Sequence, residues 1–244
     1  MERNIKIRAI TLKKIKIGES NIGVTLLTED DRVLFVMAFG AAKPKSRLFS
    51  SVNPFVFSMW NLYYDPIKDL WRGKDSDVID NNSKLQLSIE KFYIASFFSE
   101  IILKSQGSAG VFSLLYQGLV TLSATDNRDR IIVQFILRYL LGQGILPSFE
   151  YCDSCERRVD KESLYYIGFD EFSCSRCLKV HNYIELTAGA IIYWDRTRTM
   201  DITTAINISL ELESLLKLKK YCIALIRKHT EGKLSTLDSA DGLI

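Results

Sequence analysis

Four of the five cysteines form two pairs whose spacing is typical of a metal site. Cys152-x-x-Cys155 and Cys174-x-x-Cys177 are separated by eighteen residues, a spacing found in four-thiolate zinc sites. Each C-x-x-C turn can aim two sulfurs at one ion, and four thiolates complete the tetrahedral shell of Zn²⁺ without leaving a position for water. We therefore expect one structural Zn²⁺ per chain, with these four cysteines as its ligands.

Other uses of the cysteines are two disulfides, four free thiols or an iron–sulfur cluster, although nothing else in the chain suggests redox chemistry. His181 follows Cys177 by four residues and could replace a ligand, but a surface position is the simpler interpretation. Cys222 lies at helical spacing among leucines, which predicts a buried core thiol.

The first quarter of the chain carries an excess of positive charge. Residues 1–64 contain ten Lys and Arg but five Asp and Glu, whereas the whole chain of 244 residues has a net charge of +3. Such asymmetry is typical of proteins that bind polyanions. The candidate DNA-binding residues are Lys13, Lys14, Lys16, Arg32, Lys43, Lys45 and Arg47.

Aromatic residues are interleaved with these cations. They are Phe35, Phe39, Phe49, Phe55, Phe57 and Trp60. Aromatics and cations together suit single-strand binding by base stacking and phosphate contacts. The alternative is that most of the aromatics form a core and that the charges are an ordinary solvated surface.

Patterns typical of enzymes are missing from the sequence. There are two histidines, His181 and His229, and neither a P-loop, nor G-x-S-x-G, nor H-E-x-x-H occurs. We therefore expect a protein that is not an enzyme. No secretory signal opens the chain, and the longest charge-free stretch, 105–125, is too polar to span a bilayer. A cytoplasmic protein, associated with the nucleoid and not with a membrane, is expected, where cysteines favour metal over disulfides.

The pattern of hydrophobic residues predicts an α+β protein. Short strands with turns between them run from about residue 5 to residue 64, which indicates a small barrel or sandwich. Polar segments at 65–66 and 73–82 predict a boundary, so we expect a β domain at 1–80 and a helical domain at 81–244.

The period then becomes helical. A long amphipathic run begins with Ser83 as a possible N-cap, and further helices are expected at 111–123, 128–141 and 206–229. Gly232 is placed to cap the last of these helices. The cysteine-rich segment at about 148–183 is predicted to be a zinc finger inserted among them.

The order of these features resembles the RecO family of bacterial recombination mediators. The similar segments are Gly18-Glu19-Ser20 before Val24–Thr28, Gly40-Ala41…Lys45-Ser46-Arg47 before Asn53-Pro54-Phe55, Phe135-x-Leu137 and Gly144-x-x-Pro147 before the cysteines, and Gly232–Thr236. Three departures stand out. Glu156 replaces a frequent Gly after the second cysteine, Asp170-Glu171 replace a Gly-Gly before the third, and Ala42 replaces a basic residue.

The resemblance implies an N-terminal five-stranded OB-fold barrel, followed by a helical domain that carries the Cys₄ zinc finger. It implies binding of single- and double-stranded DNA and annealing of complementary strands. With RecR, the family helps to load RecA on strands coated by single-stranded-DNA-binding protein. Rival interpretations are a zinc-ribbon adaptor that binds only proteins, or a metal-dependent nuclease, for which no open metal site is predicted.

The resemblance also implies recognition of the acidic, apolar tail of the coating protein. In this chain the helix at 128–141 combines apolar residues with the cations Arg128, Arg130 and Arg138. These arginines are the predicted partner-binding residues, because such a tail needs an apolar groove with cations at its rim. The alternative is that the apolar residues are core and that the arginines are used within the fold.

Overall fold

The structure is a computed structural model that describes residues 3–105, 108–159, 162–168, 170–230, 234–239, 242 and 244. Its contacts divide the chain into two compact units. One unit comprises Met1–Ala124 with Leu234–Ile244, and the other Thr125–Lys233. The predicted division at residue 80 stays a prediction, because contacts do not report which part folds independently. The predicted cap at Gly232 lies outside the described residues.

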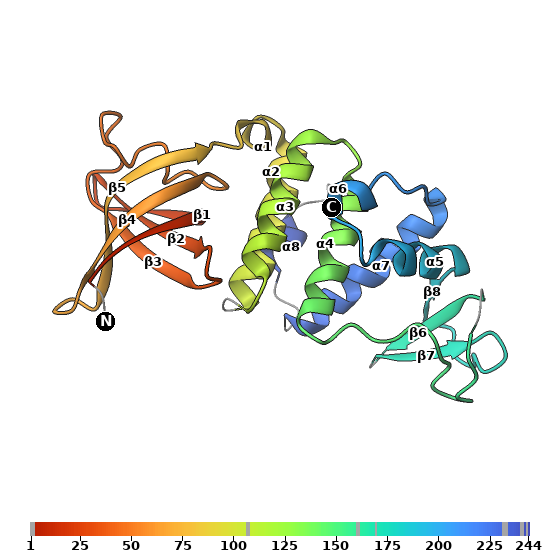
Figure 1. The fold of residues 1–244 in the computed structure, drawn as a ribbon. Coiled ribbons are helices and arrows are strands. Elements are labelled where there is room, and N and C mark those ends of the chain that lie inside the picture. Colours follow the sequence, from red (N-terminus) through yellow and green to blue (C-terminus); the bar gives the residue numbers. More distant parts are fainter. Residues whose placement is uncertain are drawn as a thin grey trace. The chain divides into compact units, whose positions relative to one another are not determined.

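A closed five-stranded barrel opens the first unit (Figure 1). Its strands are β1 (Asn4–Ile17), β2 (Asn21–Thr28), β3 (Val33–Ala38), β4 (Phe57–Asp65) and β5 (Leu70–Asp80). The order around the barrel is β1-β2-β3-β5-β4, and the antiparallel pairing of β4 with β1 closes it. Only the β3–β5 pair is parallel among the pairs described. This is the OB-fold arrangement, as expected.

The barrel is filled by every second residue of its strands, because successive side chains point to opposite faces of a sheet. Val24 and Leu26 of β2, Val36 of β3, and Trp60 and Leu62 of β4 are all buried in one cluster. The other set of side chains faces outwards. Some of these, such as Ile10, Leu27 and Phe57, are buried, whereas others, such as Arg8 and Phe35, are exposed.

Two strand predictions were wrong. The polar segment 73–82 was not expected to contain a strand, but β5 occupies most of it, since its polar side chains lie on the outer face of the barrel. Gly73 lies under Trp60, and a Cβ there would come within 3.1 Å of the indole. Residues 53–56 were expected to be extended but form turns, and Phe55 has a positive φ of 69°.

The helices of the first unit are α1 (Ser83–Leu87), α2 (Ile89–Ser105), α3 (Val111–Ala124) and α8 (Ser235–Ser239). The long run predicted to start at Ser83 is therefore two helices. Ser88 separates them with an extended backbone, and its Oγ accepts a hydrogen bond from the Lys91 N–H at 3.3 Å. A serine side chain that caps the following turn favours a new helix start over continuation.

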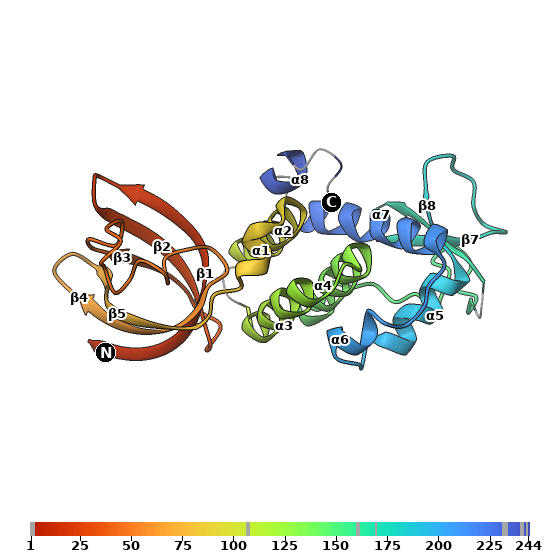
Figure 2. The same cartoon turned by 90° about the horizontal axis from the view of Figure 1, so that it is seen from above.

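The second unit contains α4 (Arg128–Gly142), a three-stranded sheet, α5 (Ala188–Thr197), α6 (Ile202–Ala205) and α7 (Leu212–His229). The sheet has the order β7-β6-β8, with β6 at Leu164–Gly168, β7 at Glu171–Cys174 and β8 at Ile184–Leu186. α4 and α7 pack side by side (Figure 2). Cys222 of α7 is buried, as predicted. Among the described helices, none is long and apolar enough to cross a membrane.

The last long helix begins six residues later than predicted. Ile206 ends α6 and Glu211 has an extended backbone before α7. The Asn207 side chain donates to the Thr203 carbonyl at 2.8 Å. Asparagine favours turns because its side chain competes for backbone partners in this way.

Candidate metal centre and nucleic-acid interface

The four paired cysteines come together in the second unit. Cys152 and Cys155 lie in a turn before β6, Cys174 ends β7, and Cys177 lies in the turn that follows. Their Sγ atoms are all within 4.8 Å of one another. A tetrahedral Zn²⁺ with Zn–S bonds of about 2.3 Å places sulfurs about 3.8 Å apart. This donor set could therefore hold a metal ion. His181 is exposed and does not belong to the cluster.

Backbone geometry prepares the cysteines for a cation. The Cys174 N–H donates to the Sγ of Cys152 at 3.3 Å. Within the turns, Glu156 N–H donates to the Cys152 carbonyl at 2.8 Å, and Cys177 N–H donates to the Cys174 carbonyl at 3.0 Å. An N–H group that points at sulfur stabilises the thiolate, which is the form that binds metal.

The thiols differ in how readily they ionise. Burial acts to raise the pKa of Cys174, but the N–H groups of Cys177 and Arg176 and the Arg157 side chain outweigh it and bring the pKa to about 6. The pKa of Cys152 is also lowered, because backbone N–H groups outweigh its burial. Neighbouring thiols raise the pKa of Cys177 to about 12. A bound cation would have to displace that proton.

Aromatic residues pack together beside the strand that carries Cys174. The Phe172 ring of β7 lies within 6 Å of the rings of Phe149, Tyr166 and Tyr221. Asp153 and Phe172 also exchange hydrogen bonds, with the Asp153 N–H 2.9 Å from the Phe172 carbonyl and the Phe172 N–H 2.6 Å from Asp153 Oδ2. The two turns that carry cysteines are thus tied together.

Two of the departures from the RecO pattern lie where glycine fits best. Glu156 has φ 56° and Asp170 has φ 63°, in the left-handed region where a side chain costs about 1–2 kcal/mol. The frequent glycines at corresponding positions of the family are therefore explained by backbone conformation.

Replacing Glu156 by glycine is expected to stabilise the finger by about 0.5 kcal/mol. The relief of the left-handed conformation exceeds the extra entropy that glycine gives the unfolded chain. Glu156 is exposed, so its side chain contributes little packing. Urea unfolding of the metal-loaded protein measures the change. Glu171→Gly, within β7, is the control and should lose about 0.5–1 kcal/mol. Equal losses in both variants would contradict the conformational explanation.

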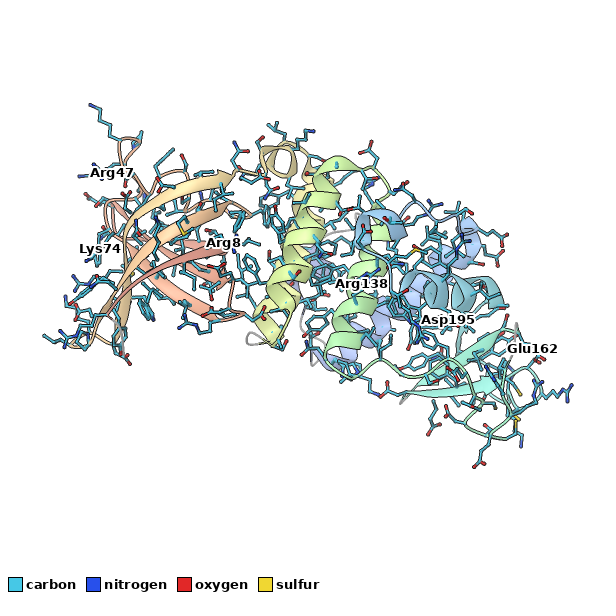
Figure 3. The ribbon with its side chains drawn as sticks, viewed as in Figure 1. Arg8, Arg47, Lys74, Arg138, Glu162 and Asp195 are labelled. Atoms are coloured by element: carbon cyan, nitrogen blue, oxygen red, sulfur yellow. The ribbon has the colours of Figure 1, made fainter. Side chains whose placement is uncertain are left out.

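The seven predicted DNA-binding cations are all exposed on the first unit. Lys13, Lys14 and Lys16 lie in β1, while Lys43, Lys45 and Arg47 lie in the connection between β3 and β4. Figure 3 labels Arg47 in this connection. Arg32 lies beside β3 and forms an ion pair with Asp30 at 2.7 Å, so the carboxylate partly neutralises its charge. Arg47 is 82% exposed although its guanidinium lies 3.4 Å from Asp75.

Strand register defines a continuous row of residues on the outer face of the barrel. Ile15 pairs with Gly23, Gly23 with Met37, and Met37 with Arg72. The row continues from Arg72 to Tyr63 and ends at Asn4. Cross-strand neighbours lie on the same face of a sheet, so these side chains form one surface, here called the outer row.

Phe35 lies across the outer row because Gly23 has no side chain. A Cβ at Gly23 would be 2.7 Å from the Phe35 ring. The ring is 43% exposed, so one of its surfaces is free. A flat aromatic ring held on a sheet is the platform on which a nucleic-acid base stacks.

Cations accompany two further rings at the outer row. Arg72 lies 5.4 Å from the centre of the Phe39 ring, and Lys74 lies 4.9 Å from that of Tyr63. Phe39 is 46% exposed. Arg72 and Lys74 are not among the DNA-binding residues predicted from the sequence, although the alternation in Trp71-Arg72-Gly73-Lys74 was a signal for a strand.

The predicted aromatics thus divide by exposure. Phe35, Phe39 and Phe49 are exposed, whereas Phe55, Phe57 and Trp60 are buried. The three exposed rings remain candidates for base stacking. The three buried rings belong to the core, as the alternative interpretation expected.

The candidate partner-binding residues Arg130 and Arg138 are used within the second unit. Arg138 donates to the carbonyls of Thr197 at 2.9 Å and Arg198 at 3.2 Å, and Arg130 donates to the Ile206 carbonyl at 3.1 Å. These carbonyls are at helix ends, where intrahelical partners run out. The α4 residues Ile131, Phe135 and Leu137 are fully buried.

An OB-fold barrel followed by a helical unit with a four-cysteine cluster defines the class of protein. The family model described as Recombination protein O N terminal matches residues 1–81, and Recombination protein O C terminal matches residues 86–238. The chain therefore belongs to the RecO family, a family of recombination and DNA repair proteins.

Curated relatives agree with this assignment. The DNA repair protein RecO of Desulforamulus reducens is 24% identical over 256 residues, covering 98% of this chain and 94% of the relative. That of Thermoanaerobacter sp. is 26% identical over 261 residues, covering 99% and 98%. That of Shouchella clausii is 28% identical over 176 residues, covering 70% and 67%.

Proposed function

We propose that this protein is a DNA-binding recombination mediator that anneals complementary single strands. The observation that carries the proposal is the outer row. There the Phe35 ring lies over Gly23 with one surface exposed, and cations lie beside the rings of Phe39 and Tyr63. Stacking on such rings tolerates any sequence, because every base has a π-face. Family membership supports the same function.

Annealing needs no chemical step from the protein. Two strands repel each other through their phosphates, and a basic surface lowers this repulsion by replacing condensed counterions. Base pairing then supplies the driving force. Lys13, Lys14, Lys16, Lys43, Lys45 and Arg47 are the proposed phosphate contacts, with Arg32 less effective because Asp30 already pairs with it.

The proposed cofactor is one structural Zn²⁺ per chain, held by Cys152, Cys155, Cys174 and Cys177. Four thiolates would close the coordination shell, so the metal would stabilise the finger and would not activate water. The protein is accordingly proposed not to be an enzyme.

The proposed partners are single- and double-stranded DNA, RecR, the single-stranded-DNA-binding protein and, through them, RecA. The proposed site of action is the nucleoid in the cytoplasm. Arg128, Arg130 and Arg138 remain the predicted contacts for the coating protein. A tail bound there would have to share Arg130 and Arg138 with the backbone carbonyls that they already contact.

Annealing is expected to proceed without ATP and without strand cleavage. Two complementary oligonucleotides labelled with a fluorescence donor and acceptor should pair at least tenfold faster with the protein than without it, because the phosphates are neutralised. The rate should not change when ATP is added, and the strands should remain intact in Mg²⁺.

Acceleration that requires ATP, or shortened strands on a denaturing gel, would contradict the mechanism. Failure to retain labelled single-stranded DNA at low salt would instead favour the zinc-ribbon adaptor, which binds only proteins.

A further inference from the structure

A pocket of about 290 Å³ lies within the first unit, between β1, α2 and α8. Its mouth carries Lys13 and Lys14, and its wall includes Leu12, Phe92 and Ser99. Pockets for drug-sized ligands begin at about 300 Å³, so this one suits a smaller group, such as a single nucleobase or a single side chain.

The interior offers one polar atom that nothing in the described protein uses. Ser99 is 2% exposed, and its Oγ has no hydrogen-bond partner among the described residues. A buried hydroxyl without a partner is costly. A ligand that brings a donor or an acceptor into the pocket would remove this cost, whereas an apolar side chain would not.

An aromatic ring forms one side of the pocket. Phe92 is 39% exposed and packs edge-on against Phe55, with the ring centres 5.3 Å apart. The contact holds Phe92 in place from one direction and leaves ring surface free. A planar group entering the pocket can stack on that surface.

The wall formed by α8 is fixed by a carboxylate. Glu100 of α2 accepts hydrogen bonds from the Ser235 N–H at 2.8 Å, the Ser235 hydroxyl at 2.7 Å and the Thr236 N–H at 2.9 Å. Both of its oxygens are thereby engaged. These hydrogen bonds hold α8 in place as a wall of the pocket. Because Glu100 carries negative charge, a neutral group is better suited to the interior than an anionic one.

Charge at the mouth completes the description. Lys13 is exposed, and Lys14 gives one hydrogen bond to Asn53 Oδ1 at 2.8 Å. An ammonium group has three donors, so Lys14 can still contact an anion. A nucleotide unites a neutral planar base with an anionic phosphate, which matches an uncharged interior and a cationic rim.

We propose that this pocket takes up one unstacked nucleobase of a DNA strand whose phosphates lie against Lys13 and Lys14. The inference rests on the proposed function, since it names a second contact of the same DNA strand. A base inserted here would anchor the strand at one point, while the outer row lets other bases stack without preference.

Photochemical cross-linking tests the occupant directly. A thymine oligonucleotide with single 5-iodouracil substitutions is irradiated with the full-length protein, and the adducts are mapped by mass spectrometry. An adduct on Phe92 of α2, which lines the pocket, is the expected result. It should disappear in Ser96→Trp, because Ser96 lines the pocket and the indole would fill it.

Affinity measurements give a second readout. Phe92→Ala should weaken single-strand binding at least fivefold, since stacking on an aromatic ring is worth about 1–3 kcal/mol per base. The matched control is Tyr116→Ala, which removes an exposed ring of α3. This ring packs against buried Phe57, with the ring centres 5.1 Å apart. It should leave binding within twofold. Thermal unfolding verifies that both variants fold.

The outcomes separate this inference from the proposed function. Salt-dependent DNA binding with adducts only outside α2, and with Phe92→Ala binding like the wild type, would overturn the base pocket alone. Absence of any DNA binding would overturn both. If an acidic peptide with an apolar end binds, and binds no worse to Ser99→Ala, while DNA gives no adduct on α2, the pocket is a peptide site and the inference is wrong.

Discussion

Replacing Cys174 by serine is expected to release the metal and to unfold the finger. Cys174 is buried at the end of β7, and its N–H also orients the Cys152 sulfur. Serine cannot supply a thiolate, and apparent zinc-binding free energies of about 10–16 kcal/mol in small zinc domains are at the same time folding free energy. The bound zinc should fall from one per chain to nearly none, by metal analysis of the purified protein.

Hydrogen exchange should then show rapid exchange throughout β6 and β7, where the wild type is protected. Lowering the pH should release zinc from the wild type too, because protons compete for the thiolates. Cys222→Ser is the matched control, because Cys222 is buried but lies outside the cluster. It should lower stability and keep the metal. Wild-type protein with no zinc, or with an iron chromophore, would refute the prediction.

Replacing Lys43, Lys45 and Arg47 together by alanine is expected to flatten the salt dependence of DNA binding. Each phosphate contact contributes about 0.7–0.9 to the slope of log K against log salt concentration, so the slope should fall by about two to three units. The three side chains are exposed and lie in one connection of the barrel. Titration of labelled single-stranded DNA at several salt concentrations measures the slope.

Two further variants serve as comparisons for the triple variant. Phe35→Ala should weaken binding at least fivefold and leave the slope unchanged, because it removes stacking and no charge. Arg32→Ala should change the slope less than any one of the three, since Asp30 already pairs with Arg32. A triple variant with the wild-type slope would move the phosphate contacts elsewhere, with Lys13, Lys14 and Lys16 as the next candidates.

Local sequence patterns were enough to predict the cysteine cluster and several of the barrel strands. A C-x-x-C turn is a local structure, so the spacing of Cys152 and Cys155 already brings two sulfurs together. Runs rich in residues that favour strands likewise located β2 and β3. The excess of cations in residues 1–64 needed no fold to be seen, and their exposure follows from the cost of burying charge.

Features that depend on residues far apart in the chain could be seen only in the folded protein. β5 is too polar to be recognised alone and forms because β4 and β3 pair with it. The sequence pattern does not say which aromatic ring faces the solvent. Phe35 and Trp60 were therefore equivalent candidates for base stacking, and only the barrel shows that Phe35 is exposed and Trp60 is buried. Arg130 contacts the carbonyl of Ile206, and Arg138 that of Thr197. Glu100 likewise meets Ser235 only because α8 returns to α2. Such contacts close long loops, and no local pattern encodes them.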